Sequence, residues 1–164
     1  MSATGLDELY REVILDHYRD PHGAAEVVNA VVEVEGHNPL CGDELHMHLD
    51  IADGRIRGVH IDPRGCSISV ASASMLAQQL EGASLEDAVE LKKTFQSVMT
   101  GGDWPEGFDP GDLEALEGVK NFPVRIKCAL LAWMTLEQAL AEFDADLVGE
   151  VEADRDIEVI TKKS

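Results

Sequence analysis

The chain is poor in cysteine, aromatic residues and uninterrupted apolar stretches for its 164 residues. Its three cysteines are too few, and odd in number, for a framework of disulfides. With aromatics at 5%, the core is expected to consist mainly of aliphatic side chains. No stretch reaches the about 18 consecutive apolar residues of a membrane span, and the charged first residues do not resemble a signal peptide. We therefore expect a cytoplasmic protein with reduced thiols.

Basic residues are also scarce, which excludes a large class of partners. Lys and Arg number 13 against 32 Asp and Glu, giving a formal net charge of −19. A surface this anionic repels phosphates, and no basic cluster is dense enough to reverse that locally, so no nucleic-acid partner is expected. Solubility or a partner with a basic docking face would each explain the acidity, and the charge does not decide between them.

Hydrophobic periodicity predicts a helix followed by three strands. Apolar side chains recur at helical spacing over residues 6–18. The next segments are rich in β-branched residues or alternate apolar and polar ones, and the Asp53-Gly54 pair favours a hairpin turn. These segments cover residues 27–36, 44–51 and 55–62. They predict a small three-stranded antiparallel sheet.

Helices are predicted after the sheet, over residues 66–82, 84–102 and 122–143. Ser84 is a plausible N-cap, and a loop rich in Gly, Pro and Asp precedes the last helix. The expected fold class is α+β, with the helices on one face of the sheet and a single domain over residues 1–143. The acidic tail, residues 144–164, is open to three interpretations: a frayed helix, an added strand or disorder.

Each cysteine lies at the end of a predicted element: Cys41 in a Gly/Pro turn, Cys66 at a strand-to-helix junction and Cys128 early in the last helix. Helix starts favour thiolates. Together with Asp43, three thiolates make a possible ligand set for tetrahedral Zn²⁺, whereas Ca²⁺ and Mg²⁺ prefer oxygen ligands. From spacing alone, the alternative is that Cys66 and Cys128 are small buried hydrophobes.

Arg125 and the histidines are further candidates. Arg125 stands three residues before Cys128 on the same predicted helix face. Its guanidinium could hold Asp43 or offset the negative charge of the ligands, and the alternative is an ordinary surface arginine. His46 and His48 lie on the polar face of a predicted strand, and with His60 they are interpreted as surface or sheet-packing residues.

Four stretches carry a resemblance to a known family: HNPLCGD (37–43), GCSIS (65–69), ASASML (71–76) and FPVRIKCALLAW (122–133). With them, residues 6–143 resemble the IscU-like superfamily of iron–sulfur cluster assembly, and more closely its SufU-type branch of zinc-dependent sulfurtransferases. Lys127 stands where IscU-type scaffolds typically carry histidine, and residues 97–121 are similar to an insertion of the SufU branch.

The resemblance implies a function and a role for each site residue. A pyridoxal-phosphate-dependent cysteine desulfurase of the SufS type would be the partner, and Cys41 would accept its persulfide sulfur. The chain would stimulate the desulfurase and carry sulfur toward a downstream cluster assembly scaffold. The resemblance further implies that Cys41, Asp43, Cys66 and Cys128 hold Zn²⁺, that a histidine of the desulfurase displaces Cys41, and that Arg125 steadies Asp43 or the released thiolate.

Two other functions stay open at this point. One is an IscU-type scaffold on which an iron–sulfur cluster is assembled, because the set of three cysteines and one aspartate is common to both branches. The other is a zinc-stabilised interaction module without sulfur chemistry.

Overall fold

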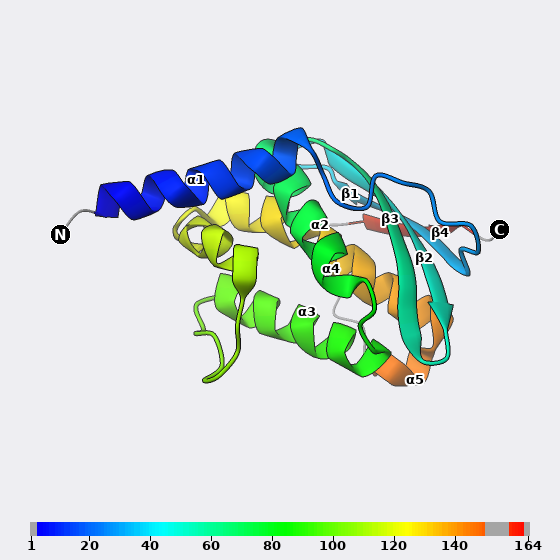
Figure 1. Cartoon of the computed structure of the whole chain (residues 1–164). Coiled ribbons are helices and arrows are strands. Elements are labelled where there is room, and N and C mark those ends of the chain that lie inside the picture. Colours follow the sequence, from blue (N-terminus) through cyan, green and yellow to red (C-terminus); the bar gives the residue numbers. More distant parts are fainter. Residues whose placement is uncertain (1–2, 150–157, 163–164) are drawn as a thin grey trace.

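The structure, a computed structural model, describes residues 3–149 and 158–162 as an α+β fold with its helices gathered on one side of a sheet (Figure 1). In chain order the elements are α1 (Ala3–Arg19), β1 (Val32–Asn38), β2 (Asp43–Ala52), β3 (Arg55–Arg64), α2 (Ser67–Leu80), α3 (Leu85–Met99), the 3-10 helix η1 (Gly111–Asn121), α4 (Pro123–Phe143), α5 (Ala145–Val148) and β4 (Glu158–Lys162). The predicted fold class is confirmed. None of the helices in these two ranges is long and apolar enough to cross a membrane.

The three predicted strands form an antiparallel meander, and a fourth strand extends it. The sheet order is β3-β2-β1-β4. Asp53 and Gly54, with φ of 55° and 72°, adopt the left-handed conformation that a two-residue hairpin turn requires. β4 pairs antiparallel with β1. Of the three interpretations open for the tail, an added strand is the one that residues 158–162 adopt.

The sheet has a buried inner face and a polar outer face. β2 alternates strictly between buried and partly exposed residues, beginning with buried Asp43. Its apolar side chains point inward, and those of His46 and His48 point outward. On the inner face, α2 packs against β3 and α4 packs against β1. A Cβ atom at Gly36 would collide with the side chain of Thr135, so this glycine is what allows β1 and α4 to approach closely.

Buried polar contacts fix α2 relative to α4, the two helices that carry cysteines. The Ser72 hydroxyl on α2 donates to the Ala129 carbonyl at 2.6 Å and accepts the Trp133 indole N–H at 2.9 Å. Trp133 also stacks on Phe95 of α3, with ring centroids 4.3 Å apart. The starts of α2 and α4 are therefore held at a defined separation.

η1 begins inside residues 103–116, which the sequence predicts as a loop. Leu113, Leu116 and Val119 are buried at a spacing of three residues, which is the period of a 3-10 helix. The predicted cap of α3 is confirmed, because the Ser84 hydroxyl accepts the Asp87 N–H at 3.1 Å.

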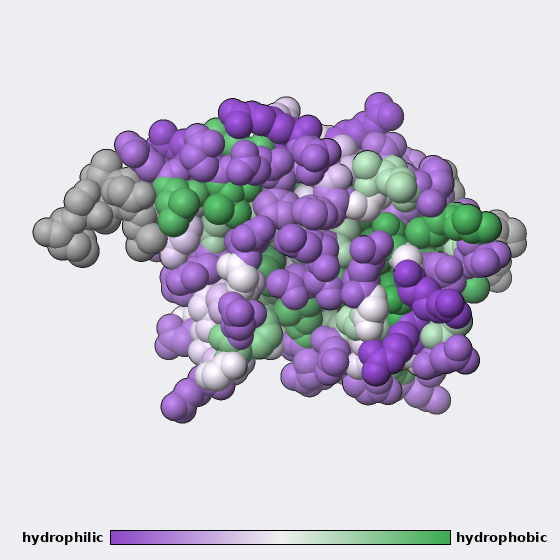
Figure 2. Space-filling view, in the orientation of Figure 1, coloured by the Kyte–Doolittle hydropathy of each residue, from purple (hydrophilic) through white to green (hydrophobic). Residues whose placement is uncertain are grey.

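The segment between α1 and β1 crosses from the edge of the sheet to its outer face. The Gly23 carbonyl accepts the N–H of Ile61 on β3, and the Val31 N–H donates to the Leu49 carbonyl on β2, both at 2.8 Å. Between these points the Val27 side chain lies over Gly58 of β3, so close that a Cβ atom there would collide with it. Most of the visible surface is hydrophilic, in keeping with the net charge (Figure 2).

Candidate metal centre

The structure brings Cys41, Asp43 and Cys128 together at one end of the sheet, and Cys66 joins them only through its contact with Asp43. Cys41 lies in the turn between β1 and β2, and Asp43 is the first residue of β2. Cys66 is the N-cap of α2, and Cys128 lies in the second turn of α4. The Cys41 Sγ is 3.0 Å from Asp43 Oδ2 and 3.5 Å from Cys128 Sγ, and the Cys66 Sγ is 3.7 Å from the same carboxylate oxygen.

A tight turn presents Cys41 to the solvent. The Asn38 carbonyl accepts the N–H groups of Cys41 and Gly42 at 3.3 and 2.8 Å, and the Asn38 side chain accepts that of Leu40. Gly42 has a φ of 73°, which glycine adopts at little cost. Cys41 is exposed at the tip of this turn.

Asp43 is the centre of the site and is only 2% exposed. Its Oδ1 accepts the backbone N–H of Cys66 at 3.0 Å, while its Oδ2 faces the thiols. Gly65 has a φ of 153°, and a Cβ atom there would collide with the Asp43 carboxylate. Sequence reasoning did not identify this requirement, although Gly65 directly precedes Cys66.

The other two thiols are held by helix starts. The Cys66 Sγ accepts the N–H of Ser69 at 3.4 Å, as a serine N-cap would. Cys128 is only 2% exposed, and its Sγ lies 3.8 Å from the Val124 carbonyl of the preceding turn. Cys41 is thus the accessible thiol of the set, while Cys128 is enclosed.

Burial works against ionisation of two of these thiols. Although Cys41 is exposed as a residue, partial desolvation of its thiol, followed by the hydrogen bond with Asp43, raises the pKa of Cys41 above its ordinary value. Burial also raises the pKa of Cys128, and its hydrogen bonds with Asp43 and Cys41 raise it further. Acidic groups this close need a cation to ionise together, and a metal ion deprotonates coordinating thiols outright.

The geometry fits zinc. Ligand atoms of Cys41, Asp43 and Cys128 all lie within 4.8 Å of one another. Tetrahedral zinc, with Zn–S bonds of about 2.3 Å and Zn–O bonds of about 2.0–2.2 Å, places its ligand atoms roughly 3.4–3.8 Å apart. The Sγ–Sγ distance of 3.5 Å and the Cys66 Sγ–Oδ2 distance of 3.7 Å fall in that range. The Cys41 Sγ–Asp43 Oδ2 distance of 3.0 Å is shorter, so these two atoms would have to move apart to bind the same ion. Thiolate ligands favour zinc over Mg²⁺ or Ca²⁺.

Arg125 is not drawn into this group. It is exposed in the first turn of α4. Within residues 3–149 and 158–162, no hydrogen bond or ion pair joins its guanidinium to Asp43 or to a cysteine. A role for Arg125 therefore depends on a rearrangement or on a partner.

Exposed apolar side chains flank the cysteines. Leu40, next to Cys41, is 71% exposed, and Phe122 and Val124 at the start of α4 are 62% and 71% exposed. We call Leu40, Phe122 and Val124 the apolar rim. Large apolar side chains that are exposed to solvent and form a contiguous patch mark interaction surfaces. Sequence reasoning missed the rim, although all three residues lie inside the motif stretches.

A Ser-His-Asp chain elsewhere in the molecule has the order of a catalytic triad, but its serine is enclosed. The Ser74 hydroxyl is 2.7 Å from His17 Nδ1, and His17 Nε2 is 2.8 Å from Asp112 Oδ2. Ser74 is fully buried, and its oxygen already accepts the backbone N–H of His22. No substrate can reach it, so this chain of contacts ties α1 to α2 and η1.

An α+β domain whose turn and helix starts gather three thiols and a carboxylate belongs to the class of IscU-like proteins. The family model described as "NifU-like N terminal domain" matches residues 9–148. The chain belongs to this family.

Proteins similar to this chain come from both the SufU and the IscU branch of the superfamily. The chain is 42% identical to "Zinc-dependent sulfurtransferase SufU" of Bacillus subtilis, over 84% of this chain and 92% of that protein. It is 35% identical to "Iron-sulfur cluster assembly scaffold protein IscU" of Streptococcus pyogenes, over 85% and 87%. The crystal structure described as "Putative iron-sulfur cluster assembly scaffold protein for SUF system (FiSufU)", from Fervidobacterium islandicum, matches with a TM-score of 0.71 and 34% identity, over 79% of this chain and 94% of that one. The resemblance found in the sequence motifs is confirmed.

Proposed function

We propose that this chain is a zinc-dependent sulfurtransferase of iron–sulfur cluster assembly. It accepts persulfide sulfur from a SufS-type cysteine desulfurase, stimulates the turnover of that enzyme, and passes the sulfur to a downstream assembly scaffold. The observation that carries the proposal is the exposed Cys41 thiol in contact with the buried Asp43 and Cys128. The 42% identity to a zinc-dependent sulfurtransferase supports it.

The residues divide into an acceptor and a holding set. Cys41 is at the tip of an exposed turn, where a partner's sulfur can reach it. Asp43, Cys66 and Cys128 are fixed by a strand start and two helix starts, so they would hold Zn²⁺ together with Cys41. Bound zinc supplies a charge that keeps thiols ionised near neutral pH, which burial otherwise opposes.

The transfer step is a thiol–disulfide type exchange. The Cys41 thiolate attacks the terminal sulfur of the desulfurase persulfide, forming a new S–S bond. The bond between that sulfur and the desulfurase cysteine breaks, and the electron pair leaves with the desulfurase thiolate. No oxidant is needed, because the persulfide already contains the oxidised sulfur. Reduced thiols are needed, so a cytoplasmic location is part of the proposal.

The apolar rim and the charge of the chain suit a docking partner. Leu40, Phe122 and Val124 would be covered when the desulfurase approaches Cys41. With a net charge of −19, this chain favours a partner face that is basic. Arg125, exposed beside the rim, would steady Asp43 or the released thiolate in the complex.

The deciding experiment is desulfurase turnover with and without this chain, zinc-loaded and metal-stripped. Strong stimulation by the zinc form, lost in Cys41→Ala, is expected. A scaffold, which the 35% identity to IscU favours, would instead give no stimulation and would develop cluster absorbance when iron and sulfide are supplied. A zinc-stabilised module would give neither result, and Cys41→Ala would then lower its melting temperature.

A further inference from the structure

A row of metal-ligating side chains crosses the outer face of the sheet, away from the cysteines. Glu33 on β1 is directly opposite His48 on β2, and His48 is directly opposite His60 on β3. Directly opposed residues on one face bring their Cβ atoms to about 4.5–5.5 Å. The imidazole rings of His48 and His60 lie with centroids 5.2 Å apart.

The carboxylate of Glu26 contacts both histidines of this row. It belongs to the segment between α1 and β1 that crosses the outer face. Its Oε1 is 3.3 Å from His60 Nε2, and its Oε2 is 3.6 Å from His48 Nδ1. The ligand atoms of the three residues all lie within 4.8 Å of one another. Glu33 Oε1 lies 4.0 Å from the same His48 nitrogen and provides a possible fourth ligand.

The hydrogen bonds of His60 leave one nitrogen directed at this group. Its Nδ1 is 3.2 Å from the Ala25 carbonyl, which can only accept, so Nδ1 carries the proton. In the neutral ring, the Nε2 lone pair then faces the Glu26 carboxylate, and either a second ring proton or a metal ion between the two acceptors would satisfy this contact. A metal-bound histidine typically donates its other N–H to a backbone carbonyl in this way. The side chain of His60 is only 10% exposed, so its orientation is fixed.

We propose that Glu26, His48 and His60 bind a divalent first-row transition-metal ion on the outer face of the sheet. Two imidazoles and a carboxylate are a ligand set that zinc and ferrous iron accept, and Mg²⁺ and Ca²⁺ do not favour it. This site uses nitrogen and oxygen, whereas the candidate metal centre uses mainly sulfur. It is more open to solvent, because Glu26 is 72% exposed.

The two sites are independent of each other. Asp43 and His48 belong to the same strand but point to opposite faces of the sheet. They are five residues apart in β2, or about 16 Å at the rise of an extended strand. An ion at Glu26, His48 and His60 therefore does not share a ligand with the cysteines.

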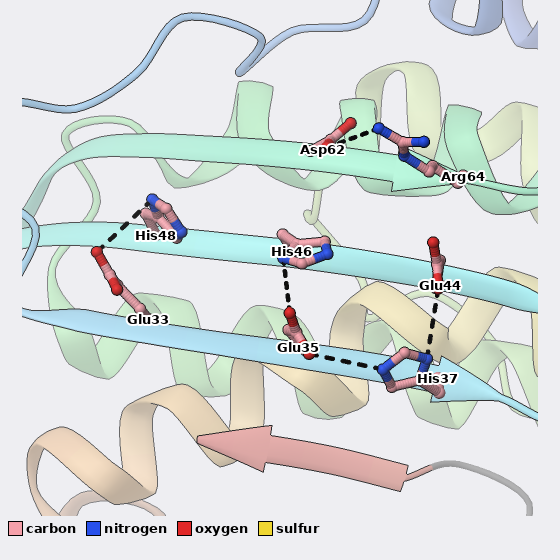
Figure 3. A network of polar contacts seen from close by, with 8 residues as sticks. All are labelled: Glu33, Glu35, His37, Glu44, His46, His48, Asp62 and Arg64. Atoms are coloured by element: carbon pink, nitrogen blue, oxygen red, sulfur yellow. Dashed lines mark ion pairs between the residues drawn. The ribbon is translucent and has the colours of Figure 1, made fainter. Parts of the chain in front are cut away.

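The neighbouring rows supply a matched control. Along the same face, His46 lies between Glu35 and Asp62, and His37 lies opposite Glu44 (Figure 3). His46 Nδ1 is 3.0 Å from Glu35 Oε1. Glu35 also lies 3.8 Å from His37 Nε2 through its other oxygen, but among the described residues only Glu26, His48 and His60 on this face have ligand atoms that all lie within 4.8 Å of one another. His46→Gln thus removes an imidazole from the same face without touching the proposed ligands.

The test is a calorimetric zinc titration of the full chain, without an affinity tag and with its first equivalent of zinc already bound. Wild type is expected to bind one further equivalent. The affinity for this second equivalent should fall by at least about 10–100-fold in Glu26→Gln, His48→Gln and His60→Gln, because losing even an outer-shell partner of a metal costs that much. His46→Gln should leave it unchanged. Glu26→Gln alters an exposed side chain, so a folding defect cannot explain its result.

Two results would overturn the proposal. The first is that the zinc-loaded wild type binds no further zinc. The second is further binding that Glu26→Gln and His60→Gln reduce no more than His46→Gln does, since the outer face would then attract zinc without a defined site. Sulfur transfer in all four variants should match wild type, because none of them reaches the cysteines.

Discussion

Gly65 lies directly against Asp43, where a Cβ atom would collide with the carboxylate. The carboxylate can receive the Cys66 N–H and face the thiols only because Gly65 has no side chain. The position of this candidate metal ligand therefore depends on a glycine that contributes no ligand itself.

Gly65→Ala is expected to displace Asp43 and lower zinc affinity by about 10–100-fold, as loss of a supporting contact does at other metal sites. Zinc content after challenge with a chelator is the measurement. Gly82→Ala is the control, because Gly82 also has a positive φ, of 83°, but no atom within 4 Å of an added Cβ. Zinc retention in Gly65→Ala equal to that of Gly82→Ala and wild type would contradict the prediction, and an equal loss in both variants would assign the effect to backbone strain.

Cys41→Ala is expected to fold and to keep zinc through the remaining ligands, yet to accept no sulfur. Cys41 is exposed, so its truncation removes little buried surface and should hardly change the melting temperature. Alkylation and mass measurement after incubation with the desulfurase and L-cysteine would detect a persulfide on wild type. Sulfur transfer at the wild-type level in Cys41→Ala would exclude Cys41 as the acceptor.

Arg125→Ala is expected to slow sulfur transfer without loss of zinc, because the guanidinium is exposed and does not reach Asp43 in the isolated chain. Desulfurase stimulation and zinc content are measured together. Arg19→Ala, an exposed arginine on α1, is the control. Arg125→Lys separates two roles: lysine would restore a docking charge but not a bidentate hold on a carboxylate. Unchanged desulfurase stimulation in Arg125→Ala would show that Arg125 has no role in sulfur transfer and is an ordinary surface residue.

The buried ion pair between Lys92 on α3 and Glu137 on α4, at 2.6 Å, is expected to matter for stability. Glu137→Leu leaves a buried ammonium uncompensated and should lower the free energy of unfolding by about 3–5 kcal/mol. Adding Lys92→Met should recover much of that loss. The exposed pair of Lys120 and Glu117 is the control, and Glu117→Gln should cost only about 0–1 kcal/mol. Urea unfolding measures the free energy of unfolding of each variant. An equal loss in Glu137→Leu and Glu117→Gln would contradict the prediction.

Local patterns made much of the fold predictable. The alternation in β2, the Asp53-Gly54 hairpin and the Ser84 cap depend on neighbours in the sequence, and all three are confirmed. η1 was missed because its three-residue spacing stands in a stretch rich in Gly and Pro. Pairing of β4 with β1 depends on a contact between distant parts of the chain, which periodicity does not report.

Residue types alone left the candidate site open between a metal ligand set and buried hydrophobic cysteines, and the family resemblance favoured the ligand set. Spacing along the chain does not reveal that Cys128 Sγ comes to 3.5 Å from Cys41 Sγ, because tertiary packing of α4 decides it. The outer-face histidines were interpreted as surface or sheet-packing residues. Their relation to Glu26 was hidden, because that residue comes from an irregular segment without a periodic pattern.

The stability of the metal-free protein is expected to fall at alkaline pH. Burial raises the pKa of Cys128 in the metal-free folded chain above its unfolded value of about 8.5. The folded state thus holds this proton more tightly, so the stability it contributes is present below about pH 8.5 and is lost as pH rises further. The free energy of unfolding of metal-stripped protein should fall between about pH 8.5 and 10, and less so in Cys128→Ala. Zinc-loaded protein should not show this fall, because metal binding releases the thiol protons and is favoured by higher pH. Urea unfolding across that range measures both slopes, and parallel slopes for wild type and Cys128→Ala would contradict the assignment to Cys128.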